Sequence, residues 1–254
     1  MISPMDSSLI SGGSDQRRRF LDGIISQFDK QYLDKLIAYN NVLQQRNALL
    51  KQFAISRSFD GALLEIMDEQ LTNPGLYIHK ARLNFLEDFI PIFAKHYKFL
   101  SENAEEVQLS YVSTLQGQEY LVALKASLHK DCALQHTSAG IHRDDLHFLL
   151  QGNEIKKYAS QGQQKTYLLS LKLAQYDYIK IKTGIKPLLL LDDVYDKLDN
   201  KRFEKLISLV SSEDFGQVFI TDTSTKRMLD LFVGNKGSRI FEIGKNGIKQ
   251  LTGK

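Results

Sequence analysis

The chain has 254 residues, of which 43% are apolar and 25% charged, and this balance is ordinary for a soluble globular protein. The length allows one large domain or two small ones. Because the net charge is only +3, any nucleic-acid-binding surface must be a local basic patch. A single cysteine, Cys132, excludes an internal disulfide framework and agrees with a cytoplasmic location. No apolar run reaches membrane length and no signal peptide opens the chain, so we expect no membrane association.

The first twenty residues indicate a loop followed by a basic helix. Met1–Pro4 reads as the end of a strand, and Ser11–Ser14 is a glycine-containing loop whose last serine caps a helix. That helix carries Arg17, Arg18 and Arg19. Because three adjacent helical residues point in different directions, one interpretation is a solvated face with one packing contact. The alternative is that these arginines hold the phosphates of DNA.

Three further helices are expected before residue 105. Asp29 begins the first, which runs to about residue 53, and its apolar stripe is typical of a helical hairpin or a short coiled coil. Phe59–Leu71 and Leu76–Leu100 form two more helices, separated by Asn73-Pro74-Gly75. We therefore expect residues 1–105 to form a mainly α-helical lobe that projects from a sheet domain at residues 106–254.

The next part of the chain alternates between strand and helix patterns. Val107–Ser113 alternates as a strand does, and residues 119–131 read as a helix. Leu146–Leu150 and Ile155–Tyr158, joined by Gly152-Asn153, are expected to form a hairpin.

A polar bend before that hairpin contains two histidines and two aspartates close together. A metal site formed by His142, Asp144, Asp145 and His147 is one interpretation of this bend. Because a strand directs alternate side chains to opposite faces, these ligands would not converge, and a salt-bridged brace is favoured.

The middle of the chain reads as a capped helix followed by a short strand. Ser160 is a good N-cap for a helix with apolar residues at helical spacing, and Gly184 ends it. Leu188–Leu191 is a solid apolar run that is typical of a strand buried on both faces. Asp192 and Asp193 then lie at the carboxyl end of that strand, where α/β sheets place their ligands.

After residue 199 the pattern continues through one helix and several strands. Arg202–Val210 is expected to be helical and Gln217–Ile220 a strand. Arg239–Ile243 and Ile248–Leu251 form a hairpin closed by Asn246-Gly247, a type I′ turn sequence. The basic tail after Gly234 is expected to be solvated. The fold class is therefore α/β.

Several of these segments together resemble one family. The run Ser160-Gln161-Gly162-Gln163-Gln164-Lys165 resembles the signature motif of ABC-type ATPases, in the form found in the RecF family of DNA replication and repair proteins. Leu188–Asp193 resembles the Walker B strand, and Leu198-Asp199 resembles the D-loop that follows it. Gly140–Leu146 is similar to a further motif of the family, with Ile141 in place of a proline. The resemblance covers the chain but only the C-terminal part of the family, and it implies a partial ABC-ATPase-like sheet core with a projecting helical lobe.

The resemblance also implies roles for these residues. Asp192 would hold Mg²⁺, and Asp193 stands where most ABC ATPases have the glutamate that activates water. The signature residues would contact ATP bound to a second subunit. Past the strand at 217–220, Thr221-Asp222-Thr223 stands where a phosphate-sensing histidine is usual, which puts that function in doubt.

One element of such an ATPase is missing from the printed sequence. It contains no GxxxxGK[ST] phosphate cradle, so we expect a fragment or truncated product that is inactive alone, with ATP and Mg²⁺ bound only by the complete protein.

Three functions remain open. The first, by resemblance, is an ATP-dependent homodimer that binds gapped or single-strand/double-strand junction DNA and loads recombination mediator proteins in DNA repair, replication and the SOS response. The second is another chromosome-maintenance or double-strand-break-repair ATPase head, although the helical lobe is short for that class. The third is a non-hydrolysing module that binds DNA or a partner, favoured for this chain alone by the missing cradle.

Overall fold

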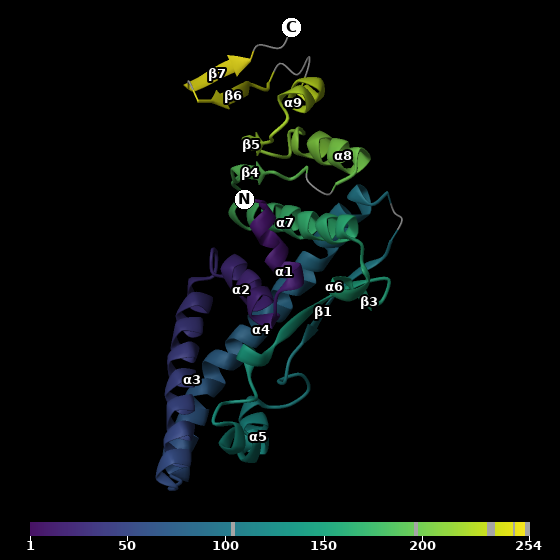
Figure 1. Cartoon of the computed structure of the whole chain (residues 1–254). Coiled ribbons are helices and arrows are strands. Elements are labelled where there is room, and N and C mark those ends of the chain that lie inside the picture. The colour runs from purple at the N-terminus through teal and green to yellow at the C-terminus, as the bar shows by residue number, and fades with distance from the viewer. Residues whose placement is uncertain (103–104, 196–197, 233–236, 246, 252–254) are drawn as a thin grey trace.

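The computed structural model describes residues 1–102, 105–195, 198–232, 237–245 and 247–251 (Figure 1). Its helices in chain order are the 3₁₀ turn η1 (Pro4–Ser7), α1 (Ser8–Ser11), α2 (Ser14–Ile25), α3 (Lys30–Ser56), α4 (Gly61–Leu100), α5 (Tyr120–Leu134), the 3₁₀ turn η2 (Ile141–Arg143), α6 (Ile155–Tyr158), α7 (Gln161–Thr183), α8 (Asn200–Val210) and α9 (Thr225–Phe232). Its strands are β1 (Val107–Val112), β2 (Asp145–Leu150), β3 (Asn153–Glu154), β4 (Leu189–Asp192), β5 (Val218–Thr221), β6 (Ile240–Gly244) and β7 (Gly247–Leu251).

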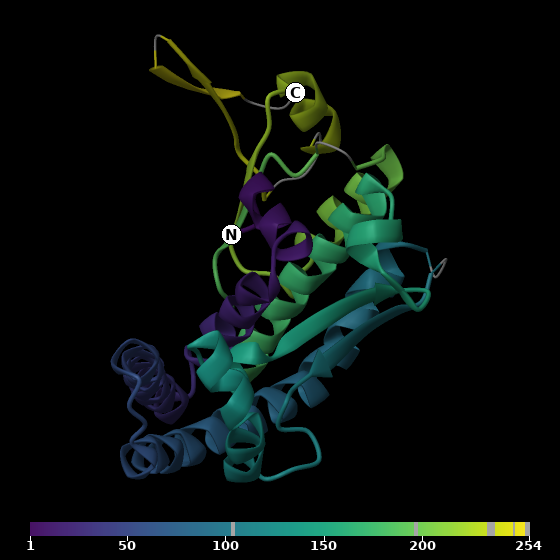
Figure 2. The same cartoon turned by 60° about the horizontal axis from the view of Figure 1, so that its bottom comes forward.

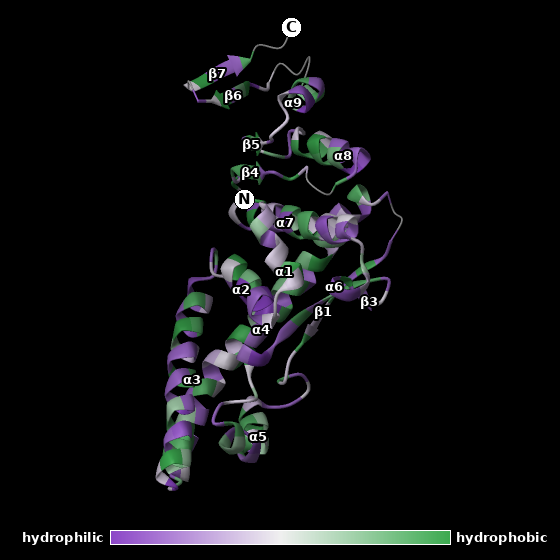
Figure 3. Cartoon of the chain, in the orientation of Figure 1, coloured by the Kyte–Doolittle hydropathy of each residue, from purple (hydrophilic) through white to green (hydrophobic). Residues whose placement is uncertain are grey.

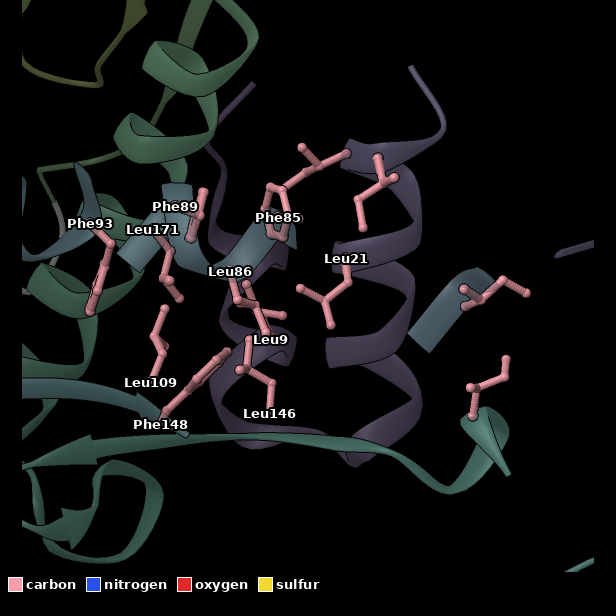
Figure 4. Close-up of a cluster of buried hydrophobic side chains, with 14 of the residues drawn as sticks. Leu9, Leu21, Phe85, Leu86, Phe89, Phe93, Leu109, Leu146, Phe148 and Leu171 are labelled. Carbon is pink, nitrogen blue, oxygen red and sulfur yellow. The ribbon is translucent and has the colours of Figure 1, made fainter. Parts of the chain in front are cut away.

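The larger hydrophobic core lies between helices and an antiparallel sheet. In that sheet β1 pairs with β2, with Leu109 opposite Phe148, and β2 pairs with β3. Helix α4 crosses this sheet, and α2, α3 and α7 pack around it (Figure 2). Side chains from α1, α2, α4, β1, β2 and α7 meet in one cluster (Figure 4). The labelled residues of that cluster are Leu9, Leu21, Phe85, Leu86, Phe89, Phe93, Leu109, Leu146, Phe148 and Leu171.

A second hydrophobic core lies between the parallel strands β4 and β5 and the helices α7 and α8. β4 pairs with β5, with Leu189 opposite Val218 and Asp192 opposite Thr221. On the other side of β4, Ile2 forms a parallel bridge with Leu191, as expected for a strand end at the beginning of the chain. Leucines of α7 and apolar residues of α8 cover one face of this pair.

The other face of β4 and β5 is open, so the expectation of a strand buried on both faces is wrong. Leu189 and Leu191 are buried, but Leu190 is 39% exposed and Phe219 is 49% exposed. A run of leucines does not distinguish a strand covered on both faces from a strand covered on one face, because leucine is common on any covered face.

The expected break near residue 74 does not occur, because α4 is one helix of 40 residues that contains Pro74 and Pro91. Pro74 and Gly75 are buried in it, and a Cβ on Gly75 would lie 2.4 Å from the ring of Tyr120. The glycine therefore serves close packing against α5 rather than a turn. Tertiary packing outweighs the local cost of both residues in the helix.

Other local predictions have mixed outcomes. Asp29 caps α3, while Gly13 rather than Ser14 is the N-cap of α2. Residues 155–158 form the short helix α6 instead of the second strand of a hairpin. The C-terminal hairpin of β6 and β7 is confirmed, although Asn246 of its expected turn lies outside the described residues.

The division at residue 105 stays a prediction. The larger core draws on both sides of that position, since β1, β2 and α7 pack with α2, α3 and α4. Along α3, hydrophilic residues are interspersed with hydrophobic ones, as in a helix covered on one side (Figure 3). In the described parts of the chain, no helix combines the length and apolar content needed to cross a membrane.

Candidate nucleotide-binding site

The start of α7 is an exposed and fully capped helix N-terminus. Ser160 Oγ accepts a hydrogen bond of 3.2 Å from the Gln163 amide, and Gln163 Oε1 accepts one of 2.7 Å from the Ser160 amide. This reciprocal capping box fixes the backbone at Gln161 and Gly162. The amides of those two residues precede the first intrahelical bond, so they face outward at the positive end of the helix dipole.

Glu105 holds the side chain of Gln163 from outside the motif. Gln163 Nε2 donates a bond of 2.6 Å to Glu105 Oε1, and the Tyr97 hydroxyl donates one of 2.5 Å to Glu105 Oε2. Gln164 is held as well, because its Nε2 donates to the carbonyl of Ala159 at 3.0 Å. The motif glutamines thus shape the turn, and Lys165 at the end of the motif is half-buried. No sequence pattern predicts the role of Glu105.

At the carboxyl end of β4, the two aspartates are tied to the neighbouring strand. Thr221 Oγ1 donates to Asp192 Oδ1 at 2.6 Å and accepts from the Asp193 amide at 3.3 Å. Asp193 has a φ of 48°, in the left-handed region that aspartate tolerates better than most residues. Both carboxylates are half-buried, so the strand end presents two partly accessible acids.

The position where a histidine is usual holds a buried aspartate instead. Asp222 accepts two bonds from Arg227 Nη1, at 2.7 and 2.9 Å. The Arg227 guanidinium lies 3.2 Å from the centroid of the Tyr195 ring, and Tyr195 donates to Asn200 Oδ1 at 2.6 Å. Contacts therefore connect the end of β5 with the start of α8. Sequence reasoning missed this chain of contacts, because Tyr195 and Arg227 are 32 residues apart.

The segment identified as a D-loop leads directly into α8. Leu198 is buried in the second core, and Asp199 caps α8 by accepting a bond of 2.8 Å from the Arg202 amide. Asp199 also forms an ion pair with the Arg202 side chain at 3.4 Å.

The acids at the end of β4 suit Mg²⁺ as a partial set of ligands. Among the described residues there is no group of three or more His, Cys, Asp or Glu side chains that could hold a metal. One oxygen of Asp192 is already bonded to Thr221, so β4 offers one or two carboxylate ligands. Mg²⁺ is commonly held by one or two carboxylates together with water and nucleotide phosphates. The donor set therefore fits a nucleotide-linked Mg²⁺ and does not form a metal site on its own.

The three arginines of α2 have different environments. Arg17 forms a bidentate ion pair with Asp145, with its Nε 2.7 Å from Oδ1. Although burial opposes it, the Arg17 guanidinium holds the pKa of the Asp145 carboxyl below its ordinary value. Arg18 Nη1 donates to the carbonyl of Asp144 at 2.8 Å, while Arg19 is exposed. The prediction of DNA binding by these arginines stays a prediction, and for Arg17 the structure gives a bracing contact.

The polar bend forms the salt-bridged brace that was favoured over a metal site. Asp144 is fully buried, with Arg82 Nη1 at 2.9 Å from its Oδ2 and the Tyr111 hydroxyl donating to the same oxygen. Burial raises the pKa of the Asp144 carboxyl, and Arg82 opposes this shift. Arg82 also binds Asp22 at 2.9 Å, so the brace joins α2, α4 and β2.

A second buried arginine was not anticipated. Arg46 of α3 is fully buried and pairs with Asp68 of α4 at 2.6 Å and with Asp131 of α5 at 2.8 Å. A heptad-like stripe on α3 predicts contacts between helices, but it does not predict which charged residue is buried.

Searches of known proteins place these elements in one family. The chain is 45% identical over 254 residues to the DNA replication and repair protein RecF of Bacteroides thetaiotaomicron, covering 99% of the chain and 68% of that protein. The chain belongs to the RecF family. The RecF of Flavobacterium johnsoniae is 49% identical over 227 residues, covering 89% of the chain and 63% of the relative. The chain thus spans less than two thirds of that relative's length.

Solved structures agree with this assignment. The structure of the recombination mediator protein RecF-ATP of the RecFOR pathway matches 99% of the chain with a TM-score of 0.81 and 35% identity, over 66% of its own length. The corresponding RecF-ATPrS structure matches with a TM-score of 0.80 and 34% identity. An Smc head domain from Pyrococcus furiosus, 14% identical with a TM-score of 0.52, shows only that the ABC-ATPase-head fold is shared. No protein-family model matches the chain.

Proposed function

We propose that this chain supplies the signature, Walker B and D-loop part of an ATP-switched DNA repair and replication protein of the RecF type. The observation that carries the proposal is the capped, exposed start of α7 at Ser160, in a chain that also presents Asp192 and Asp193 at the carboxyl end of β4. The RecF-ATP structure supports the proposal that the nucleotide is ATP, because that structure matches 99% of this chain.

The start of α7 is proposed to contact the nucleotide from across a dimer interface. Ser160 Oγ, with the amides of Gln161 and Gly162, would donate to phosphate oxygens at the positive end of the helix. The bonds of Gln163 to Ser160 and Glu105 hold that turn in place before any ligand arrives. Such preorganisation favours closure of two heads around the nucleotide, since little order remains to be gained on binding. Gln164 supports the turn through its bond to the Ala159 carbonyl.

The acids at β4 are proposed to carry the chemistry. Bound Mg²⁺ would neutralise phosphate charge, with Asp192 as its carboxylate ligand. Asp193 would orient a water molecule and accept its proton, with its backbone fixed by the Thr221 hydroxyl. Aspartate is one methylene shorter than the usual glutamate, which favours slow hydrolysis. A slow ATPase suits a switch that holds DNA between hydrolysis events.

The partners follow from the family. We propose an ATP-dependent homodimer in the cytoplasm that binds gapped or junction DNA and delivers it to recombination mediator proteins. A second candidate is a DNA- or partner-binding module without hydrolysis, favoured by the lack of a GxxxxGK[ST] sequence in these 254 residues.

Substitution of the proposed base in a full-length protein containing this segment tests the function. Asp193→Asn keeps ATP-dependent binding of a gapped DNA but lowers ATP turnover at least about a hundredfold, which is the usual contribution of a general base. The matched control is Asp214→Asn, at an exposed aspartate in the loop after α8. Unchanged turnover in Asp193→Asn would refute the assignment of the base, and DNA binding that ignores ATP would refute the switch.

A further inference from the structure

Two adjoining pockets lie along α3, and the first of them also contacts α2 and η2. The first has a volume of about 210 Å³ and the second about 430 Å³. The first is lined by Asp15, Arg18, Arg19, Asp22, Leu36, Asn40, Arg82, Ile141 and His142, and the second by Asn40, Leu43, Gln44, Asn47, Ala48 and Lys51. Since Asn40 lines both, we treat them as one groove, the α3 groove.

The polar residues of α3 in this groove share one face of the helix. Asn40, Gln44, Asn47 and Lys51 are spaced by four, three and four residues, which places them in one row. The row is about 16 Å long at 1.5 Å per residue. Arg18 and Arg19 of α2 extend it beyond Asn40.

Several polar side chains of the groove can donate hydrogen bonds to a ligand. Asn47 Oδ1 already accepts bonds from the amide and hydroxyl of Thr137, at 2.7 and 2.8 Å, so its amide NH₂ is the part left to offer. Arg18 uses one of its five N–H donors on the Asp144 carbonyl. Lys51 and Arg19 are exposed cations.

The acids lining the groove cancel little of this charge. Asp22 is paired at 2.9 Å with Arg82, which also lines the groove and offsets its charge, while the second partner of Arg82, Asp144, is fully buried. Asp15 is the other lining carboxylate, set against Arg18, Arg19 and Lys51. A ligand with only acceptors and negative charge is the chemical match for such a surface.

We propose that the α3 groove binds the phosphodiester backbone of DNA. This inference rests on the proposed function, which makes DNA the ligand, and it places the contact on Arg18, Arg19, Asn40, Asn47 and Lys51. It excludes Arg17, whose guanidinium is held by Asp145. A row of about 16 Å laid along the duplex axis covers the axial rise of roughly four to five nucleotides of one strand, at 3.4 Å each. Contacts of this kind position DNA without reading its sequence.

The test measures DNA binding by this chain directly. Fluorescence anisotropy with a labelled 30-base-pair duplex is recorded between 50 and 200 mM salt for the native chain and for Arg19→Gln/Lys51→Gln. The double variant loses two phosphate contacts, so the slope of log K against log salt falls by about 1.8 and the affinity at 50 mM salt falls about tenfold or more. The matched control Lys95→Gln/Lys98→Gln removes two exposed lysines of α4 and keeps the native slope.

A second pair of variants tests the position on the helix. Asn40→Asp places a carboxylate where the two pockets join and weakens binding at least about fivefold, by repulsion of the phosphates. Asn41→Asp adds the same charge at an exposed residue that does not line the groove, and it leaves binding within about twofold.

Equal slopes for Arg19→Gln/Lys51→Gln and its control would overturn the groove, as would equal binding by the two aspartate variants. Absence of duplex binding by the native chain at 50 mM salt would overturn it too. The ATP dependence of the full-length protein, measured separately, decides the proposed function in either case.

Discussion

The hydroxyl of Thr221 bonds to both consecutive aspartates at the carboxyl end of β4. It donates to Asp192 Oδ1 at 2.6 Å and accepts from the Asp193 amide at 3.3 Å. The residue belongs to β5, which runs parallel to β4 and ends at the same edge. Adjacent parallel strands thus fix the direction of the proposed Mg²⁺ ligand and the backbone of the proposed base.

We expect Thr221→Val in the full-length protein to weaken the use of Mg²⁺. Loss of one hydrogen bond to a carboxylate, worth about 1.5 kcal/mol, raises the Mg²⁺ concentration needed for ATP-dependent dimerisation roughly tenfold. A titration of Mg²⁺ followed by light scattering measures the midpoint. Thr223→Val, at an exposed threonine two residues later, leaves it unchanged. Equal midpoints for the two variants would contradict the positioning role.

The buried arginine of α3 makes a prediction about stability. Arg46→Met removes the partner of Asp68 and Asp131, both buried, so the free energy of unfolding falls by about 3–5 kcal/mol. Urea denaturation of this chain measures the change. Arg57→Met, at an exposed residue beyond the end of α3, changes it by less than about 0.5 kcal/mol. A loss below about 1 kcal/mol for Arg46→Met would show that the two carboxylates find other partners.

His142 predicts how stability depends on pH. Its Nδ1 lies 2.8 Å from the Tyr39 hydroxyl and its Nε2 lies 3.0 Å from the Thr137 carbonyl. The Thr137 carbonyl can only accept, so Nε2 carries a proton, and in the neutral ring Nδ1 then accepts from the Tyr39 hydroxyl. Burial lowers the pKa of His142 to about 4.

Because the unfolded chain takes up this proton near pH 6.5 and the folded one only near pH 4, the contribution of His142 to stability falls as the pH drops between those values. The expected loss between pH 7 and pH 5 is about 2 kcal/mol. Urea denaturation at both pH values checks this. His142→Gln removes most of the loss, and His129→Gln, at an exposed histidine, retains it. The same pH dependence in both variants would assign it to other groups.

Local sequence predicted the elements whose signals are short-range. Ser160 and Gly184 bound α7 as expected, and the pairing of residues 188–191 with 218–220 is confirmed. The motifs around Ser160 and Asp192 were visible because the residues of each are contiguous.

The failures share a different cause. Asn73-Pro74-Gly75 reads as a break, yet Gly75 lies against Tyr120, a contact 45 residues away that no local pattern encodes. Leu190 was expected to be buried, but which face of a strand is covered depends on neighbouring elements. Tertiary packing decided both, and the same holds for Glu105 beside Gln163 and Thr221 beside Asp192.

The printed chain makes its own prediction about nucleotide. Without a GxxxxGK[ST] cradle, the β- and γ-phosphates have no enclosing amides, so we expect neither tight binding nor hydrolysis of ATP by this chain alone. Isothermal calorimetry with Mg²⁺ and ATP measures the affinity, and a dissociation constant in the micromolar range would contradict the expectation.

We propose that the start of α7 contacts nucleotide only across a dimer. In the full-length protein, we expect Ser160→Arg to leave ATP binding by the monomer within about twofold, because Ser160 is proposed to contact only the nucleotide of the other subunit. Arginine would fill the space of the phosphate contact and prevent closure of the two heads. The control is Ser208→Arg, at an exposed serine of α8 outside the motif.

Sedimentation velocity in the presence of ATP is the decisive measurement. The native protein and Ser160→Ala, which keeps the space open, shift toward the dimer, although the alanine variant does so more weakly because it lacks the hydroxyl. We predict that Ser160→Arg sediments as a monomer at saturating ATP while Ser208→Arg dimerises like the native protein. A Ser160→Arg protein that dimerises with ATP and hydrolyses it would show that the capping box of α7 is only a helix cap, and would contradict the account.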